Sequence, residues 1–174
     1  MARIEIYIIT KKKKELRFYS NIQGASSFHI HIWNKLEEKY LPSYEPKPKY
    51  IGTEYYSRFV AQMFAFLHGE KENNPMQEVW NLGWDDRLSE DEKLAMRVTL
   101  DNSYIPYDSL LRVADALECS TFTTPQCKDV AKVLREIYKE KENKQPLGVY
   151  INTSNVSTEE VYDKDKLFSV TDEE

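Results

Sequence analysis

The sequence predicts an α+β fold, in which about five helices cover a small, mostly antiparallel sheet made of an N-terminal hairpin and a C-terminal strand. Two observations lead to this class. Residues near both ends of the chain alternate between apolar and polar, while apolar residues in the middle recur at helical spacing. With 174 residues, of which 41% are hydrophobic and 30% charged, the chain has the size and composition of a single domain, 1–174.

The first two strands are expected in RIEIYIIT (3–10) and ELRFYS (15–20). Isoleucine occupies every second position in the middle of the first segment, which is the pattern of a strand with one buried face. In the second segment the same alternation places Leu16 and Phe18 on the inward face. The short lysine-rich connection between the two segments predicts a hairpin, and no Asn-Gly or Asp-Gly pair identifies its turn type.

The remaining strands are expected near the C-terminus. LGVYIN (147–152) alternates between apolar and polar residues, and KLFSV (166–170) is a weaker candidate of the same kind. The acidic residues TDEE (171–174) follow the last candidate, and we expect them to form a flexible tail.

Four helices are expected in the middle of the chain, where start signals precede apolar residues at helical spacing. Ser89 and Glu92 stand in the register of a capping box, in which each residue satisfies a backbone N–H of the first turn. Thr124 followed by Pro125 is also typical of a helix start. The four helices are expected to begin after Thr53, Ser89, Asp108 and Thr124.

The segment SSFHIHIWNKLEEKYL (26–41) contains His29 and His31, two of the three histidines. In a strand, the two imidazoles would lie on one face and could share a transition metal ion. In a helix, they would lie about 200° apart and could not. Two serines suited to an N-cap precede the histidines, and NKLEEKYL favours a helix, so we expect a helix with His29 beside Trp33 and His31 on the solvent side.

A metal-dependent enzyme would need His68 and a carboxylate to converge with His29 and His31. The sequence contains none of the common phosphate-loop, dinucleotide, serine-hydrolase or zinc-protease motifs. Cys119, at the end of a predicted helix, is more typical of packing than of a nucleophile, and the carboxylates of WDDRLSEDE (84–92) suit a helix N-terminus. We therefore expect no catalytic residue, metal or cofactor, and keep the metal enzyme as an alternative.

Positive charge is concentrated in the N-terminal part of the chain. Residues 1–58 contain 11 Lys or Arg against 6 Asp or Glu, although the whole chain has a net charge of −5. Four of these cations, Lys11, Lys12, Lys13 and Lys14, are consecutive in the predicted hairpin. Such a patch can bind phosphates, so a nucleic-acid-binding regulator is a second alternative, but lysines in a turn also discourage unwanted strand pairing.

The segment YLPSYEPKPKYIGTEYY (40–56) contains five of the twelve tyrosines together with three prolines, and we expect a Tyr/Pro-rich loop at 42–52. Prolines stiffen such a segment, so its rings can be presented at a low cost in entropy. Tyrosine is enriched at protein interfaces because it combines apolar area with a polar tip. Packing of these rings onto the helices is an equally good interpretation. The partner contacts that we predict are Tyr44, Tyr50, Tyr55 and Trp84, with Lys11 to Lys14 as a steering patch.

Taken together, these patterns predict a non-enzymatic, cytosolic module that binds another protein, such as an adaptor, an inhibitor or a modulator of host machinery encoded by a phage or other mobile element. No apolar run is long enough to span a membrane, and the apolar N-terminal stretch precedes its lysines, the reverse of a signal peptide. The sequence leaves the partner and the oligomeric state open.

Overall fold

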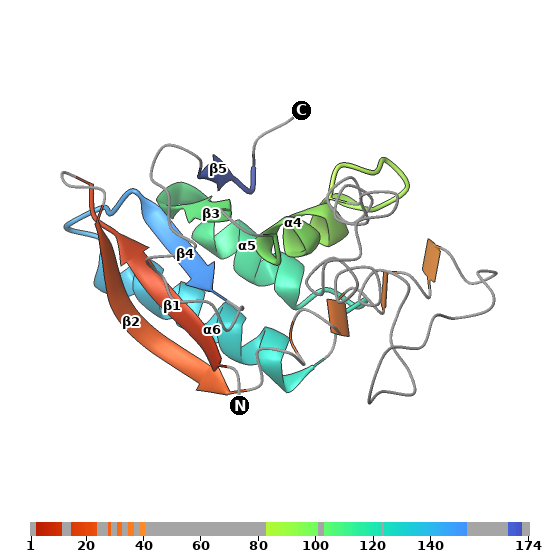
Figure 1. The fold of residues 1–174 in the computed structure, drawn as a ribbon, viewed down its shortest axis with the longest axis horizontal. Helices are drawn as coiled ribbons and strands as arrows, with labels where there is room; N and C mark the ends of the chain where they lie inside the picture. Colours follow the sequence, from red (N-terminus) through yellow and green to blue (C-terminus); the bar gives the residue numbers. More distant parts are fainter. Residues whose placement is uncertain are drawn as a thin grey trace, which may run out of the picture.

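The computed structural model describes residues 3–11, 15–23, 28, 31–32, 35–36, 39–40, 83–100, 103–122, 124–152 and 167–171. Figure 1 shows the arrangement of their helices and strands. A short 3₁₀ turn, Tyr107–Ser109, directly precedes the helix that begins at Leu110. The elements follow in the order β1 (Arg3–Ile9), β2 (Leu16–Gln23), α4 (Glu90–Val98), β3 (Ser103–Pro106), α5 (Leu110–Leu117), α6 (Pro125–Glu140), β4 (Gly148–Asn152) and β5 (Phe168–Ser169).

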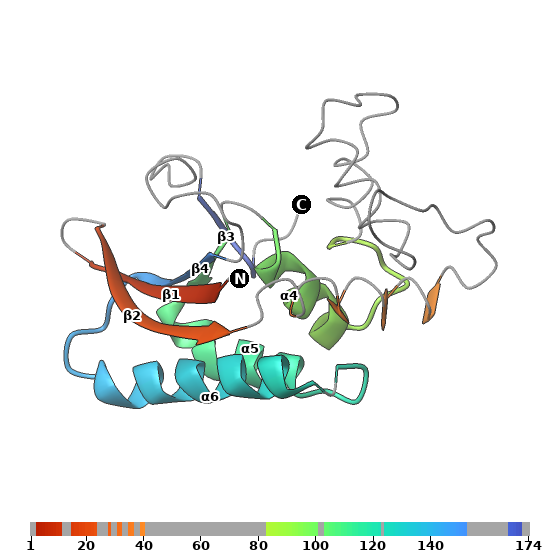
Figure 2. The same cartoon turned by 60° about the horizontal axis from the view of Figure 1, so that its bottom comes forward.

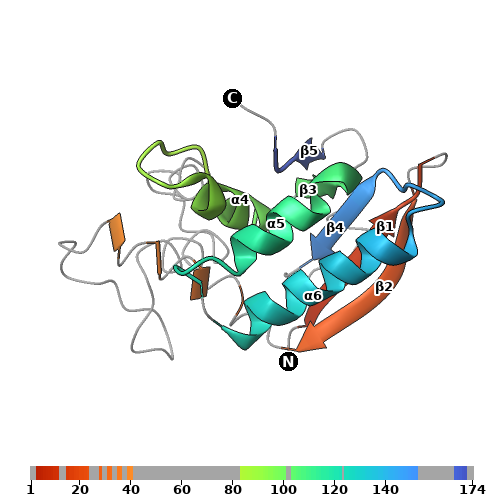
Figure 3. The ribbon, with the colours of Figure 1, turned by 180° about the vertical axis from the view of Figure 1, so that it is seen from behind.

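The strands form one five-stranded sheet in the order β2-β1-β4-β3-β5. Its pairs are antiparallel except for β3 and β5, which run parallel, so the sheet is mixed. Helices α5 and α6 lie side by side on one face of the sheet, which we call the helix face (Figure 2 and Figure 3). We call the opposite face the outer face; none of α4, α5 and α6 covers it.

This architecture corrects the predicted fold class. Instead of about five helices over a small, mostly antiparallel sheet, the described residues form three α-helices with defined bounds and a mixed sheet of five strands. Strand β3 was not predicted, because SYIP is only four residues long and ends in proline. The parallel pair could not be predicted either, because β5 contributes only two residues and pairs with a strand that is distant in the chain. The helix expected after Thr53 lies outside the described residues.

Several individual elements are confirmed. The alternating segments at 3–10, 15–20 and 147–152 are β1, β2 and β4, and part of 166–170 is β5. Ser89 and Glu92 form both hydrogen bonds of the capping box at the start of α4. The Thr124 side chain accepts a hydrogen bond from the backbone N–H of Cys127 at the start of α6.

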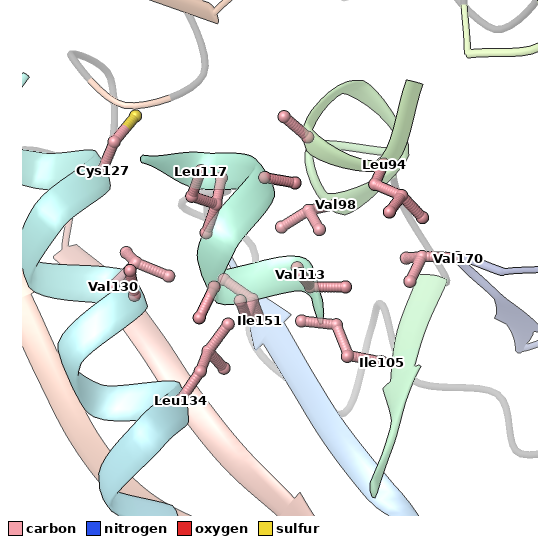
Figure 4. Close-up of a cluster of buried hydrophobic side chains, with 14 of the residues drawn as sticks. Leu94, Val98, Ile105, Val113, Leu117, Cys127, Val130, Leu134, Ile151 and Val170 are labelled. Carbon is pink, nitrogen blue, oxygen red and sulfur yellow. The ribbon is translucent and has the colours of Figure 1, made fainter. Parts of the chain in front are cut away.

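The core lies between the helix face of the sheet and the helices. Ile4, Ile6 and Ile8 of β1 are buried there, as the alternation of the sequence predicted. Opposite them, α6 contributes an apolar stripe at helical spacing (Figure 4). Other buried side chains labelled in Figure 4 are Leu94, Val98, Ile105, Val113, Leu117, Val130, Leu134, Ile151 and Val170.

A β-bulge in β2 reverses the predicted direction of Leu16 and Phe18. Ile6 pairs with Ser20, but the next residue of β1 pairs with Phe18, so Tyr19 is an extra residue. Because side chains alternate along a strand, one extra residue turns Leu16 and Phe18 from the helix face to the outer face. The prediction that they point inward is wrong for this reason, and the Phe18 side chain is 56% exposed.

The described residues of the 26–41 segment confirm the expected helix. Residues 28, 31, 32, 35, 36, 39 and 40 are helical, and Phe28, Ile32 and Leu36 are buried at intervals of four residues. The expectation that His31 faces solvent is wrong, because its side chain is half-buried and its Nε2 atom is enclosed. Burial, with a smaller effect of the Lys35 charge, lowers the pKa of His31. His29 and Trp33 lie outside the described residues.

Candidate protein-binding surface

Four aromatic residues stand in register across four strands of the outer face. Phe18 of β2 pairs with Tyr7 of β1, Tyr7 pairs with Tyr150 of β4, and Tyr150 pairs with Tyr104 of β3. Residues directly opposite each other in antiparallel strands point to the same face, so these four side chains form one line across the sheet. We call this line the aromatic row.

The rings at the β2 end of the aromatic row are in contact and partly exposed. The Tyr7 and Phe18 ring centroids lie 5.8 Å apart with an interplanar angle of 75°, an edge-to-face contact. The centroids of Tyr7 and Tyr150 lie 6.3 Å apart. Tyr150 is buried, Tyr7 is half-buried and Phe18 is largely exposed, so accessibility increases toward β2. Tyr7 is also held by its hydroxyl, which donates to Glu5 Oε2 at 3.0 Å.

The backbone of β2 presents hydrogen-bonding groups at the edge of the sheet. The Thr10 N–H donates to the Glu15 carbonyl at 2.9 Å, which marks a hydrogen-bonded position next to the hairpin. Because bonded and non-bonded pairs alternate in antiparallel strands, Arg17 is bonded to β1, whereas Leu16 and Phe18 are not. The backbone N–H and C=O groups of Leu16 and Phe18 therefore point away from β1. Among the described strands, β2 is paired on one side only.

Positive charge flanks this edge. Lys11 is exposed at the hairpin, and the Arg17 side chain is 69% exposed, with Glu15 as its ion-pair partner at 3.6 Å. No Asp or Glu occurs within β2 itself. Lys12, Lys13 and Lys14, the other predicted steering lysines, lie outside the described residues, and so do Tyr44, Tyr50 and Tyr55.

Trp84, the remaining predicted partner contact, packs against Arg97 and Phe168 of the same chain. Its ring lies 4.8 Å from the Arg97 guanidinium and 5.8 Å, centroid to centroid, from Phe168. The Arg97 guanidinium is buried and also donates to the carbonyl oxygens of Gly83 and Val170. The structure thus places Trp84 where it helps to join α4 to the segment after β5.

The Glu92 carboxylate is buried and accepts hydrogen bonds from four donors. Lys39 Nζ donates at 2.8 Å, Thr121 Oγ1 at 2.9 Å and the Ser89 backbone N–H at 2.9 Å, and the Tyr40 hydroxyl donates as well. Burial alone would raise the pKa of Glu92, but these donors together outweigh it and lower the pKa to about 2. A carboxylate so fully satisfied is suited to holding the fold together, not to exchanging protons near neutral pH.

A half-open pocket of about 690 Å³ lies beside α4. Its lysine, Lys93, is 3.2 Å from Asp86 and 3.5 Å from Glu90, and its Arg112 is 2.5 Å from Asp91. Both cations are therefore paired with carboxylates, and the lining residues within the described part of the chain include no His or Cys. Among the described residues, the lining consists of Trp84, Asp86, Glu90, Lys93, Leu94, Arg97, Arg112 and Thr171.

The metal alternative has no described ligand set. In the part of the chain that the structure describes, no three His, Cys, Asp or Glu side chains come together as ligands. His31 is described, whereas His29 and His68 are not. Of the cysteines, Cys119 is half-buried, and Cys127 is buried, which raises the pKa of its thiol.

The aromatic row was not among the predicted contacts, although two of its residues have a signal in the sequence. The alternation of RIEIYIIT does place Tyr7 opposite the buried Ile4, Ile6 and Ile8, and LGVYIN likewise places Tyr150 opposite the buried Val149 and Ile151. These two signals were available. Phe18 joins the row only because of the bulge, which no residue pattern in β2 announces.

Within the described residues, no helix is both long and apolar enough to cross a bilayer. The comparisons with known proteins give no relative from which a function could be inferred: no protein family model, curated protein or solved structure matches this chain.

Proposed function

We propose that this protein is a non-enzymatic module that binds another protein in the cytosol, and that it does so through the β2 end of the aromatic row. The single observation that carries the proposal is the position of Phe18, a large apolar side chain that is 56% exposed in strand β2. Its ring continues a line of aromatic residues and is held in place by Tyr7. Aromatic surface of this kind is enriched at protein interfaces.

The charges near Phe18 favour a protein over a nucleic acid. Glu5 lies on the same face as the aromatic row and accepts the hydrogen bond of Tyr7, so a carboxylate stands beside the ring that contacts Phe18. A phosphate backbone would be repelled there. The net charge of −5 acts in the same direction. Lys11 and Arg17 provide positive charge only at the edge of the sheet, where they can steer an acidic protein.

A photo-crosslinker placed at position 18 tests the proposal. Phe18 is replaced by p-benzoylphenylalanine, the protein is produced in its native host, and the cells are irradiated. We expect a discrete crosslinked product that contains a second protein. The matched control carries the same group at Leu111, which is 41% exposed on α5, away from the outer face.

Two results would contradict the proposal. In the first, position 18 gives no product, or gives the same products as position 111. In the second, the product at position 18 disappears on nuclease treatment, which would identify the partner as a nucleic acid.

A further inference from the structure

We propose that the partner contributes an extended, acidic segment that adds to β2 as a further strand of the five-stranded sheet. This inference rests on the proposed function and names the class of partner segment. In such strand addition, main-chain hydrogen bonds provide affinity and alternate side chains provide specificity. The geometry of β2 supplies both, together with a preference for negative charge.

The backbone of β2 is arranged to accept a strand. Leu16 and Phe18 occupy non-bonded positions opposite β1, so both of their N–H and C=O pairs point to the sheet edge. The other neighbour of β1 confirms the alternation, because the Leu147 N–H donates to the Ile9 carbonyl at 2.9 Å, which directs Ile9, the partner of Leu16, toward β4. Two residues thus offer four hydrogen-bonding groups in the spacing of a strand.

The side chains of the same two residues face outward from the sheet. Phe18 extends the aromatic row to the edge, and Leu16, half-buried, precedes it on the same face. An added strand would place every second side chain beside these two, and a cross-strand pair between Phe18 and an apolar or aromatic residue is stabilising. The exposed ring of Phe18 would therefore contact a side chain of the added strand, on the side of β2 that faces away from β1.

The positive charges at the β2 edge favour an acidic incoming strand over a cationic one. Arg17 lies between Leu16 and Phe18 and points to the helix face, where its side chain is 69% exposed, and Lys11 is exposed at the hairpin. Glu15, the carboxylate nearest to Arg17 among the described ion pairs, lies 3.6 Å from it. A cationic segment would be repelled by these groups, whereas an acidic residue on an incoming strand would pair with Arg17.

The bulge at Tyr19 sets the length of the site. A bulge increases the local twist and interrupts regular pairing, so β2 beyond Tyr19 is poorly suited to a flat added strand. Tyr19 is also tied to α6, because its hydroxyl donates to Glu140 Oε2 at 2.6 Å. The segment that binds is therefore short and centred on Leu16 to Phe18.

Peptides selected on the full-length protein test this inference without a known partner. A library of random peptides displayed on phage is selected against the immobilised protein, and the best sequence is synthesised with a fluorescent label. We expect enriched sequences in which acidic and apolar residues alternate. A version with its acidic residues changed to lysine should bind at least about tenfold more weakly, and the affinity should fall with rising salt.

Leu16→Pro separates strand addition from simple contact. Proline removes the outward N–H without removing a bond to β1, and position 16 is the first residue of the strand, where proline is tolerated. We expect the dissociation constant of the peptide to rise about tenfold in this variant, the equivalent of one lost hydrogen bond. Leu16→Ala, which keeps the N–H, is the matched control and should change the constant by less than about threefold.

Amide hydrogen exchange in the unmodified protein gives a readout that does not depend on the variant folding. Adding the peptide should slow exchange at Leu16 and Phe18, whereas Arg17, already bonded to β1, should change little. Equal binding by Leu16→Pro and Leu16→Ala, or unchanged exchange at Leu16 and Phe18, would overturn strand addition. So would a dimer in sedimentation that dissociates on Leu16→Pro, because β2 would then pair with a second copy.

The two proposals can fail separately. If the crosslinker at position 18 captures a protein but exchange at Leu16 and Phe18 is unaffected by any selected peptide, the binding function stands and strand addition is wrong. If position 18 captures nothing, the proposed function itself fails.

Discussion

Lys39 Nζ lies 2.8 Å from Glu92 Oε2, and this ion pair connects two parts of the protein that are 53 residues apart in the chain. Tyr40 and Thr121 donate to the same carboxylate, which also caps α4 through Ser89. One buried side chain thus joins the helical residues near 40, the start of α4 and the turn that follows α5. We call these groups the Glu92 cluster.

Glu92→Gln should destabilise the protein by roughly 2 to 4 kcal/mol. Glutamine has nearly the same shape, but it is neutral and brings N–H donors toward Lys39 and Tyr40, which are themselves donors. Chemical denaturation, followed by circular dichroism, measures the change. Asp86→Asn is the control, since the Asp86 side chain is fully exposed and its loss should change the free energy of unfolding by less than about 0.5 kcal/mol. Similar losses in both variants would contradict the central role of Glu92.

The Glu92 cluster also predicts how stability depends on acid. The pKa of Glu92 is about 2 in the folded protein and 4.5 ordinarily, so between these values the unfolded chain binds the additional proton. Stability contributed by the ionised carboxylate is therefore present above pH 4.5 and lost as the pH falls toward 2, by about 3 kcal/mol in total. Urea titrations at several pH values should show the free energy of unfolding falling as the pH falls from 4.5 toward 2. In Glu92→Gln the part of this fall that Glu92 contributes should be absent. An identical slope in the variant would show that other groups cause it.

Arg97→Ala should cost roughly 3 kcal/mol or more, because it leaves two buried carbonyl oxygens without their donor. In the native protein, Arg97 Nε lies 2.8 Å from the Gly83 oxygen and one terminal nitrogen lies 2.9 Å from the Val170 oxygen. Arg97→Lys should also destabilise, because an ammonium group cannot reach both oxygens while stacking on Trp84.

Thermal and chemical unfolding of both Arg97 variants measures these losses. Arg112→Ala is the control, since Arg112 forms an exposed ion pair with Asp91 and should contribute at most about 1 kcal/mol. If Arg97→Lys were as stable as the native protein, the positive charge of Arg97, and not its paired hydrogen bonds, would account for its contribution to stability.

Gly148→Ala should destabilise the sheet where β3 and β4 pair. A Cβ atom at Gly148 would lie 2.2 Å from the Ile105 carbonyl oxygen and 3.0 Å from the Tyr104 ring. The Ile105 oxygen belongs to the backbone, so relief requires the strands to separate, and we expect a loss of roughly 2 kcal/mol. Gln145→Gly is the opposite case, because Gln145 has a positive φ of 38° and glycine relieves that strain.

The stabilities of the Gly148→Ala and Gln145→Gly variants should therefore change in different ways, which chemical or thermal unfolding measures. Gly148→Ala should lower the midpoint of unfolding, and Gln145→Gly should leave it unchanged or raise it slightly. A neutral Gly148→Ala would mean that the strands are not packed as closely as described.

Local patterns predicted the elements whose signals lie within a few neighbouring residues. The alternating isoleucines of β1 and the capping signals at Ser89 and Thr124 predicted elements that the structure contains. The short strand β3 has no such signal and β5 only a weak one, because each depends on a partner strand that is distant in the chain. The predicted tyrosine contacts between 42 and 56 fall outside the described residues and stay predictions.

Of the two roles of Glu92, the sequence predicted its part in the helix cap but not its contacts with distant residues. Its position three residues after Ser89 identified it as part of a capping box, which the structure confirms. That Lys39, Tyr40 and Thr121 would converge on the same carboxylate could not be read from spacing, since these residues come from separate segments.

The sequence by itself determined which faces of β1 and β4 are apolar, where α4 and α6 begin, and that Tyr7 and Tyr150 point away from the core. Only the tertiary structure decided the order of the strands and the direction of Phe18. The physical reason is that strand order follows from contacts between distant segments, and a bulge is defined by two strands together. One extra residue at Tyr19, visible only against β1, is what moves Phe18 to the outer face and completes the aromatic row.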